Sequence, residues 1–388
     1  MNTIYLDNSA TTALCDAAKQ AMTAAMECYG NPSSLHKAGL DAEHMVKKAR
    51  EQVLSALGVR TGAGQVYFTA SGTEANNLAI FGSAYAKERR AGGRIVTTEG
   101  EHSSVEMALQ ALEKKGFDVV RIPTRRGVLD MDFANRAITK DTLLVTTMMV
   151  NNETGALYDL KALFALAKRN APGVVTHCDA VQGFMKTIFS PAAIGADMVT
   201  VSSHKIHGPK GVGALYVSAE VLKAKKLIPI TLGGGQESGM RSGTENTIGI
   251  AGFGAACARA QSTLRDDLRR MSALRTYLEG KLAEIGEIKL NLPRAGRAPH
   301  IVNLTLPDIK SETMLHYLSG QGIYVSSGSA CSSHGHATSR ALSAFGLGAE
   351  QADCSLRVSL CPANTEGEID ALCAALGTGV RELVRIHK

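Results

Sequence analysis

The sequence has 388 residues, which is too long for one small core and fits a large domain with a smaller one beside it. Its hydrophobic content of 45% and charged content of 20% are typical of a soluble globular enzyme, and no apolar run reaches the roughly 18 residues that span a bilayer. The net charge of +6 is spread along the chain and gives little reason to expect nucleic-acid binding. The eight cysteines form no C-x-x-C pair, and the first residues lack a signal-peptide pattern, so we expect reduced thiols and a cytoplasmic location.

The first two thirds of the chain alternate between predicted strands and helices. Residues 1–14 read as a short strand followed by a hydroxyl-rich turn. Further strands are predicted at 65–69, 94–98, 117–122, 143–150, 174–178, 198–201 and 212–217. Helices are predicted from 33 to 57 and at 73–86, 103–115 and 160–169. This rhythm predicts an α/β fold with a mostly parallel sheet and helices on both of its faces.

The last third has a different pattern. Residues 249–283 read as one long helix that leads out of the large domain, and strands at 301–306, 323–326 and 356–360 follow with helices between them. The spacing Thr365-x-x-Glu368 predicts a capping box at the start of a final helix. We therefore predict a large domain over residues 15–260 and a smaller α+β domain built from 1–14 and 261–388, although residues 1–14 could join either one.

Turn-forming, polar or charged residues follow five of the predicted strands. They are Gly72 and Thr73, then His102, then Asn152, then Asp179, and finally Ser202, His204 and Lys205. Each of them alone has an ordinary explanation, such as a helix cap, a surface histidine or a solvated lysine. Because ligands bind at the carboxyl ends of parallel strands, we expect these residues to meet in one site. A lysine that can form a Schiff base, a carboxylate and a helix N-terminus match the requirements of pyridoxal 5′-phosphate.

Motifs for other phosphate-bearing ligands are absent from the sequence. There is no G-x-x-x-x-G-K-[ST], and the run Gly233-Gly234-Gly235 does not form a G-x-G-x-x-G turn after a strand. A nucleoside triphosphate or a dinucleotide is therefore a poor alternative.

Several stretches of the chain resemble those of one enzyme family, in the same order. They include YLDNSATT (5–12), SGTEANN (71–77), HCDAVQ (177–182), SSHKIHGPKG (202–211) and SSGSACSS (326–333). These stretches resemble the cysteine desulfurases of the iron–sulfur-cluster and nitrogenase type, which are pyridoxal-phosphate enzymes of the class V aminotransferase family. The resemblance implies the type I fold of pyridoxal-phosphate-dependent transferases.

The resemblance also implies roles for the reacting groups. Lys205 would hold the cofactor as a Schiff base and move the Cα proton of the substrate, and His102 would stack on the cofactor ring and transfer protons. Cys331 would attack the sulfur of bound L-cysteine, which leaves a persulfide on Cys331 and releases alanine. Its Gly/Ser-rich surroundings favour a reactive thiol over a structural one.

Further residues would bind the cofactor and the substrate, again by resemblance. Asp179 would pair with the pyridinium nitrogen, and Gln182 would bond to the ring oxygen. The phosphate would be held by Gly72, Thr73, Ser202 and His204, and by Thr244 from the neighbouring subunit of a homodimer. Asn152, beside the cofactor, and Arg357 would hold the substrate carboxylate. The persulfide sulfur would pass to an acceptor such as an iron–sulfur scaffold protein.

Other interpretations stay open at this stage. Selenocysteine lysis or another pyridoxal-phosphate-dependent transfer would keep Lys205 and Asp179 without needing Cys331. Cys331, His334 and His336 have spacing that could bind a metal, although the sequence offers no evident fourth ligand. A non-enzymatic sulfur or metal carrier would use these three residues and leave the polar strand ends unexplained.

Overall fold

The larger of two main sheets organises the first two thirds of the protein. The computed structural model describes residues 3–86, 93–327 and 339–385. The seven strands of this sheet lie in the order β2-β9-β8-β7-β5-β3-β4. They are β2 (Gly64–Thr69), β3 (Arg94–Thr98), β4 (Asp118–Ile122), β5 (Thr142–Met148), β7 (Val175–Asp179), β8 (Met198–Ser202) and β9 (Gly213–Ser218). Neighbours from β8 to β4 are parallel, whereas β9 is antiparallel to both β2 and β8, which confirms the expected mostly parallel sheet.

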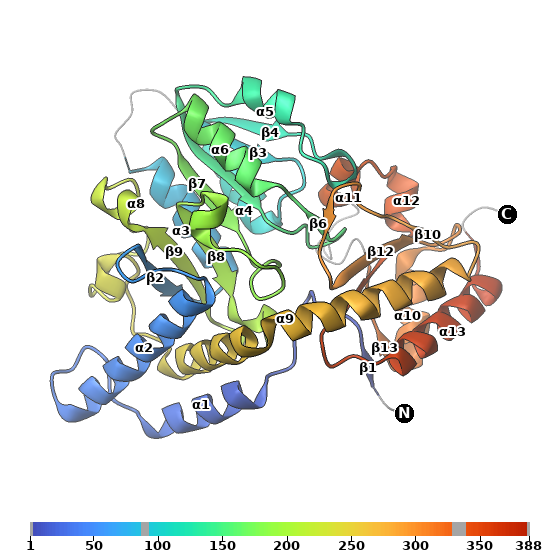
Figure 1. Cartoon of the computed structure of the whole chain (residues 1–388), viewed down its shortest axis with the longest axis horizontal. Helices are drawn as coiled ribbons and strands as arrows, with labels where there is room; N and C mark the ends of the chain where they lie inside the picture. Colours follow the sequence, from blue (N-terminus) through green and yellow to red (C-terminus); the bar gives the residue numbers. More distant parts are fainter. Residues whose placement is uncertain (1–2, 87–92, 328–338, 386–388) are drawn as a thin grey trace.

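Helices cover both faces of this sheet (Figure 1). The helices of this part are α1 (Asp16–Glu27), α2 (Lys37–Ala56), α3 (Gly72–Ala84), α4 (Ser103–Glu113), α5 (Met131–Ala137), α6 (Leu160–Asn170), α7 (Pro191–Ile194) and α8 (Ala219–Lys223). Alternating side chains of β2 show the two faces, because Tyr67 joins one core with Leu78 of α3 while Phe68 joins the other with Phe164 of α6. The predicted helices on both faces are thus confirmed.

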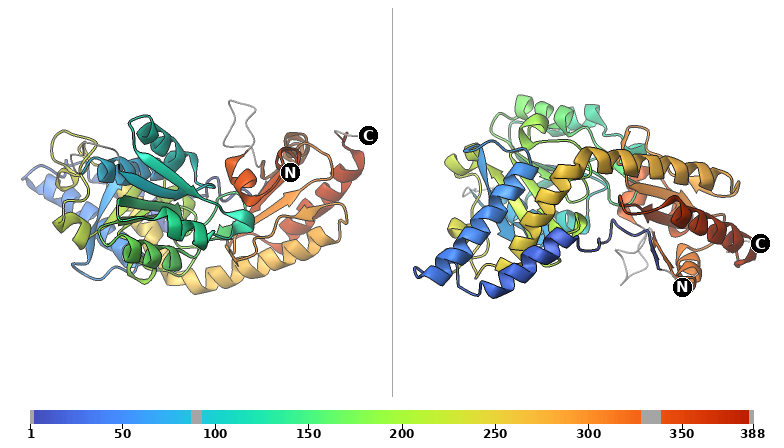
Figure 2. Two further views of the ribbon diagram at one scale, coloured as in Figure 1. Left: turned by 90° about the horizontal axis from the view of Figure 1, so that it is seen from above. Right: turned by 60° about the horizontal axis from the view of Figure 1, so that its bottom comes forward.

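The long helix α9 (Thr247–Ala283) connects the two sheets and runs beneath both in Figure 1 and in the left view of Figure 2. Its first half is rich in small residues, and the neighbouring helices approach it closely. A Cβ on Gly252 would lie 2.7 Å from Met22 of α1, and one on Gly254 would lie 2.6 Å from Ala49 of α2. Its second half carries Leu274, Leu278 and Leu282 into a separate core. Helix α1 was not predicted, and it buries few side chains of its own.

The smaller sheet is antiparallel, with the strand order β10-β12-β15-β14. Its strands are β10 (Lys289–Leu290), β12 (Ile301–Thr305), β14 (Ser326–Ser327) and β15 (Ser355–Ser359). The helices here are α10 (Ser311–Gly320), α11 (Arg340–Phe345), α12 (Ala349–Asp353) and α13 (Glu366–Glu382). Helix α13 starts with the predicted capping box, in which Glu368 N donates to Thr365 Oγ1 at 3.2 Å and Thr365 N donates to Glu368 Oε2 at 2.8 Å.

Short strands tie distant parts of the chain together. β1 (Ile4–Tyr5) pairs in parallel with β13 (Ile323–Tyr324), next to the smaller sheet, while β6 (Ala156–Leu157) pairs with β11 (Gly296–Arg297). The chain then runs from β1 back toward the larger sheet, where Thr12 N donates to the carbonyl of His204 at 3.0 Å. The domain boundaries at residues 14 and 260 stay predictions. Within the described part of the chain, no helix is long and apolar enough to cross a membrane.

Candidate active site

A pocket of about 360 Å³ lies at the carboxyl ends of the parallel strands and gathers most of the residues predicted from the sequence. Its lining includes Gly72, Thr73, His102, Asn152, Asp179, Gln182, Ser202, His204, Lys205 and Arg357. The strand-end rule for open parallel sheets thus predicted correctly that these side chains lie together.

Lys205 lies in a turn that directly follows β8, in the short 3-10 helix Ser203–Lys205. Its Nζ donates to the carbonyl of Ala10 at 2.8 Å and also to the carbonyl of Ser9. His204 beside it contacts Thr11 Oγ1 through Nδ1 at 3.2 Å, and burial together with the charge of Lys205 lowers the pKa of His204 to about 4. The N-terminal segment therefore supplies the acceptors that hold the lysine turn.

Asp179 ends β7 and is 5% exposed. Its Oδ1 accepts the backbone N–H of Val181 at 3.0 Å, and its Oδ2 accepts Nδ2 of Asn76 at 2.7 Å. Both oxygens of this buried carboxylate therefore have a hydrogen-bond donor. Asn76 was not predicted as a site residue. The sequence does contain a sign of it, because Asn76 comes three residues after Thr73. That spacing is close to one helical turn and places the amide on the same side of α3 as Thr73.

His102 is the N-cap residue of α4, and its Nδ1 accepts the backbone N–H of Ser104 at 3.1 Å. Burial lowers the pKa of His102, against the opposing charge of Asp179.

Glu101, which precedes His102, is buried, and both its carboxyl oxygens accept Met148 N, at 3.1 and 3.0 Å. Burial raises the pKa of Glu101 to about 8, so this carboxyl is protonated at neutral pH.

The start of helix α3 forms one wall of the pocket. Ser71 caps this 13-residue helix by accepting Glu74 N at 3.1 Å. Gly72 packs closely here, because a Cβ at this position would lie 2.9 Å from Val181 Cγ2 and 3.4 Å from Ser202 Cβ. The free N–H groups of a helix start favour an anion such as a phosphate group.

Arg357 enters the pocket from β15 of the smaller sheet. Its Nη2 pairs with Asp7 Oδ1 at 2.8 Å, and its Nη1 donates to the carbonyl of Asn152 at 2.8 Å. Nε of Arg357 has no hydrogen-bond partner among the described residues. Across the pocket, Gln182 donates from Nε2 to the carbonyl of Ser9 at 2.8 Å. Asp7 is a site partner that the sequence analysis missed.

Four predicted site residues are not placed in this pocket. Thr244 is exposed and is not part of the lining. Cys331, His334 and His336 lie outside the described residues. Among the residues that are described, no group of three or more His, Cys, Asp or Glu side chains is arranged to hold a metal ion.

Residues 4–372 match the model of the aminotransferase class-V family. The chain belongs to this family. It is 39% identical over 378 residues to "Cysteine desulfurase IscS" of Clostridium botulinum (strain Hall), with 96% of this chain and 93% of that protein covered. It is 37% identical over 360 residues to "Cysteine desulfurase IscS" of Dictyoglomus turgidum, with 92% and 89% covered.

Solved structures of similar proteins have the same fold. A "NIFS-like protein" superposes with a TM-score of 0.90 at 34% identity over 98% of this chain and 100% of the other. A NifS-like protein from Rickettsia africae superposes with a TM-score of 0.88 at 30% identity, again over 98% and 100%. The predicted type I fold of pyridoxal-phosphate-dependent transferases is therefore confirmed.

Enzymes of this family depend on pyridoxal 5′-phosphate, and the residues of the pocket fit that group. The pocket combines a primary amine, a buried carboxylate that accepts two hydrogen bonds, and a helix N-terminus with a glycine where a side chain would collide. A planar pyridine ring with an aldehyde, a ring nitrogen and a phosphate needs this set of partners. The residues that line this pocket are therefore the ones that would hold the cofactor.

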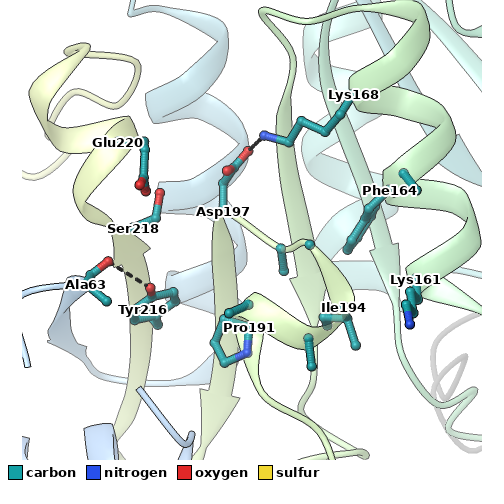
Figure 3. Close-up of a pocket in the computed structure, with 15 residues that line it drawn as sticks. Ala63, Lys161, Phe164, Lys168, Pro191, Ile194, Asp197, Tyr216, Ser218 and Glu220 are labelled. Atoms are coloured by element: carbon teal, nitrogen blue, oxygen red, sulfur yellow. Dashed lines mark hydrogen bonds and ion pairs between the residues drawn. The ribbon is translucent and has the colours of Figure 1, made fainter. Parts of the chain in front are cut away.

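A second cavity, of about 500 Å³, lies at the opposite ends of strands β8 and β9 (Figure 3). Figure 3 shows Asp197 paired with Lys168, and Tyr216 Oη donates to the carbonyl of Ala63 at 3.1 Å. Phe164 and Ile194 form an apolar wall. None of the residues predicted for the family's chemistry lines this cavity, and of its two carboxylates, Asp197 and Glu220, the first is already part of an ion pair.

Proposed function

We propose that this protein is a pyridoxal-phosphate-dependent cysteine desulfurase, which removes sulfur from L-cysteine and releases L-alanine. The observation that carries the proposal is the meeting of Lys205, Asp179, His102 and Arg357 in one pocket at the carboxyl ends of the strands. The names of the relatives, at 37–39% identity over nearly the whole chain, support the same activity.

Each pocket residue has a role in this proposal. Lys205 holds the cofactor covalently through its amine and moves the Cα proton of the substrate. Asp179 keeps a proton on the pyridine nitrogen, and Gln182 bonds to the ring oxygen. Gly72 and Thr73, with Ser202 and His204, bind the phosphate at the start of α3. When bound, the cofactor supplies an electron sink for the charge that develops at Cα.

Substrate binding and sulfur transfer involve residues from the smaller sheet. Arg357 and Asn152, which are joined by a hydrogen bond of 2.8 Å, hold the substrate carboxylate. A related protein at 30% identity, SspA, was solved in complex with cysteine. Cys331 attacks the substrate sulfur as a thiolate, so that the carbon–sulfur bond breaks, a persulfide forms on Cys331 and the remaining carbon skeleton takes up protons to become alanine.

The proposal extends to partners and location. The protein acts as a homodimer in which Thr244 of one subunit reaches the phosphate of the other, as its exposed position allows. The persulfide passes to an acceptor such as an iron–sulfur scaffold protein. The seven described cysteines are free thiols, which fits the reducing cytoplasm.

The test is incubation of the purified protein with L-cysteine and pyridoxal phosphate, followed by measurement of alanine, of sulfide and of the mass of the Cys331 peptide. We expect alanine formation and a mass gain of one sulfur atom. Lys205→Ala should abolish the borohydride-reducible cofactor adduct, whereas Cys331→Ala should keep the adduct and lose alanine production. Unchanged alanine production by Cys331→Ala would refute desulfuration through this thiol and would favour selenocysteine lysis or another transfer.

A further inference from the structure

A buried hydrogen-bond network connects the histidine and the carboxylate of the pocket through two residues that the proposed function does not use. Asn76 is 1% exposed and donates from Nδ2 both to Ser104 Oγ at 2.9 Å and to Asp179 Oδ2 at 2.7 Å. Ser104 Oγ lies 2.8 Å from His102 Nδ1. The order along the network is therefore Asp179, Asn76, Ser104 and His102.

The direction of each hydrogen bond in this network follows from chemistry. An ionised carboxylate only accepts, so the side of the Asn76 amide that faces Asp179 is the NH₂ group. In this orientation both hydrogens of Asn76 Nδ2 are donated, to Ser104 and Asp179, while Oδ1 has no hydrogen-bond partner among the described residues. Ser104 Oγ accepts from Asn76, so its own hydrogen is left to be donated.

The acceptor for that hydrogen is Nδ1 of His102. The same nitrogen also accepts the backbone N–H of Ser104 at 3.1 Å, and a backbone N–H cannot reverse its direction. A proton on Nδ1 would face both Ser104 hydrogens. The ring is consequently the neutral tautomer that carries its proton on Nε2, and Nε2 is the nitrogen left for the pocket that His102 lines.

We propose that Asn76 and Ser104 are positioning residues that lock His102 as the neutral Nε2–H tautomer, while the second hydrogen of the Asn76 amide binds Asp179. This inference rests on the proposed function for its meaning but not for its test. In this arrangement His102 donates a hydrogen bond into the pocket, because the lone pair of Nδ1 is occupied. Removal of the Cα proton then falls to Lys205.

Nitrogen-15 NMR of histidine-labelled protein tests the assignment directly, with and without pyridoxal phosphate and with no substrate present. Protonated and unprotonated ring nitrogens have well-separated chemical shifts, and a His102→Gln variant identifies the His102 signals among the 11 histidines. We expect Nδ1 of His102 to be unprotonated and Nε2 protonated at pH 7.5. A protonated Nδ1 in both forms of the protein would overturn the proposal.

Two variants test whether the network causes this state. Asn76→Leu keeps the approximate size of the side chain but removes both donors, so that Ser104 Oγ becomes free to accept a proton from His102 Nδ1. It should raise the pKa of His102 by about one unit, a roughly tenfold change in its protonation equilibrium. Ser104→Ala removes the hydroxyl donor from Nδ1 and should raise the same pKa by a smaller amount. If the His102 titration is unchanged in both folded variants, Asn76 and Ser104 do not position the ring.

Ser83→Ala is the matched control. Ser83 lies on helix α3 with Asn76, and its buried hydroxyl has no hydrogen-bond partner among the described residues. This variant should leave the His102 spectrum unchanged, and a change as large as that of Ser104→Ala would refute a specific network. Alanine production from L-cysteine is measured separately. A protein with the expected tautomer but no desulfurase activity would refute the proposed function and leave the positioning role intact.

Discussion

Lys186 carries a buried amine whose cost to stability can be worked out from the structure. The residue is 6% exposed, and its Nζ has no hydrogen-bond partner among the described residues. Burial is the main cause that lowers its pKa from 10.5 to about 7, and the charges of Lys205 and Arg357 add to the effect. We predict that Lys186→Met, which replaces the ammonium by an apolar side chain of similar length, stabilises the protein below neutral pH.

The size and sign of the effect follow from linkage. Between pH 7 and 10.5 the unfolded chain keeps a proton on Lys186 that the folded protein has lost. The stability of the wild type therefore rises with pH through this window, and the penalty is fully present below pH 7. At about 1.4 kcal/mol per pKa unit, the upper limit of the penalty is about 5 kcal/mol, and any water that reaches the amine reduces it.

The assay is denaturant unfolding of wild type and variant at several pH values from 6 to 10, with the difference in unfolding free energy as the readout. The advantage of Lys186→Met should be largest at pH 6 and should shrink as the pH rises above 7. Lys161→Met, at an exposed lysine of the second cavity, is the control and should show no such trend. A Lys186→Met protein that is less stable than wild type by the same amount at every pH would refute the reasoning, since it would mean that the amine makes a net favourable contact.

Two further predictions concern the site and its support. Arg357→Lys keeps a positive charge but loses the two-pronged guanidinium contact. The KM for L-cysteine in steady-state kinetics should therefore rise by about tenfold or more, while the visible absorbance of the cofactor stays unchanged. An unchanged KM would show that Arg357 does not bind the substrate. Burial raises the pKa of the Glu101 carboxyl from 4.5 to about 8. In Glu101→Gln an amide that does not titrate takes the place of this carboxyl. The wild type should therefore lose stability relative to this variant as the pH rises from 4.5 to 8, and parallel unfolding curves across that range would contradict a neutral Glu101.

The side chains at the strand ends could be predicted from the sequence because two general regularities act on them together. Apolar β-branched strands alternating with helices predict a parallel sheet, and the connections of such a sheet place their first residues at one edge. Asp179 ends its strand, while His102 and Lys205 come four and three residues after theirs. Their meeting in one pocket needed no information beyond the order of the elements.

Other parts of the site had no such signal. Helix α1 buries Ala18 and Ala25 against its neighbours, and two small residues do not make an apolar stripe that can be read from a sequence. The pairing of Arg357 with Asp7 joins residues 350 positions apart, on elements whose relative placement depends on how β1 pairs. The carbonyls of Ser9 and Ala10 that accept from Lys205 are backbone groups, which every sequence has.

The N-terminal segment after β1 has a role that these contacts define. Asp7 pairs with Arg357, the carbonyl of Ser9 accepts from both Gln182 and Lys205, and the carbonyl of Ala10 accepts from Lys205 as well. Buried donors without acceptors cost free energy, and this segment supplies acceptors for the donors of the pocket. In the proposed function, a covalent bond at Lys205 releases at least one of these carbonyls, whereas a substrate carboxylate at Arg357 can also use the unpartnered Nε. Binding of the cofactor at Lys205 in the proposed function is therefore an exchange of partners, and it is less favourable than the new contacts alone would make it.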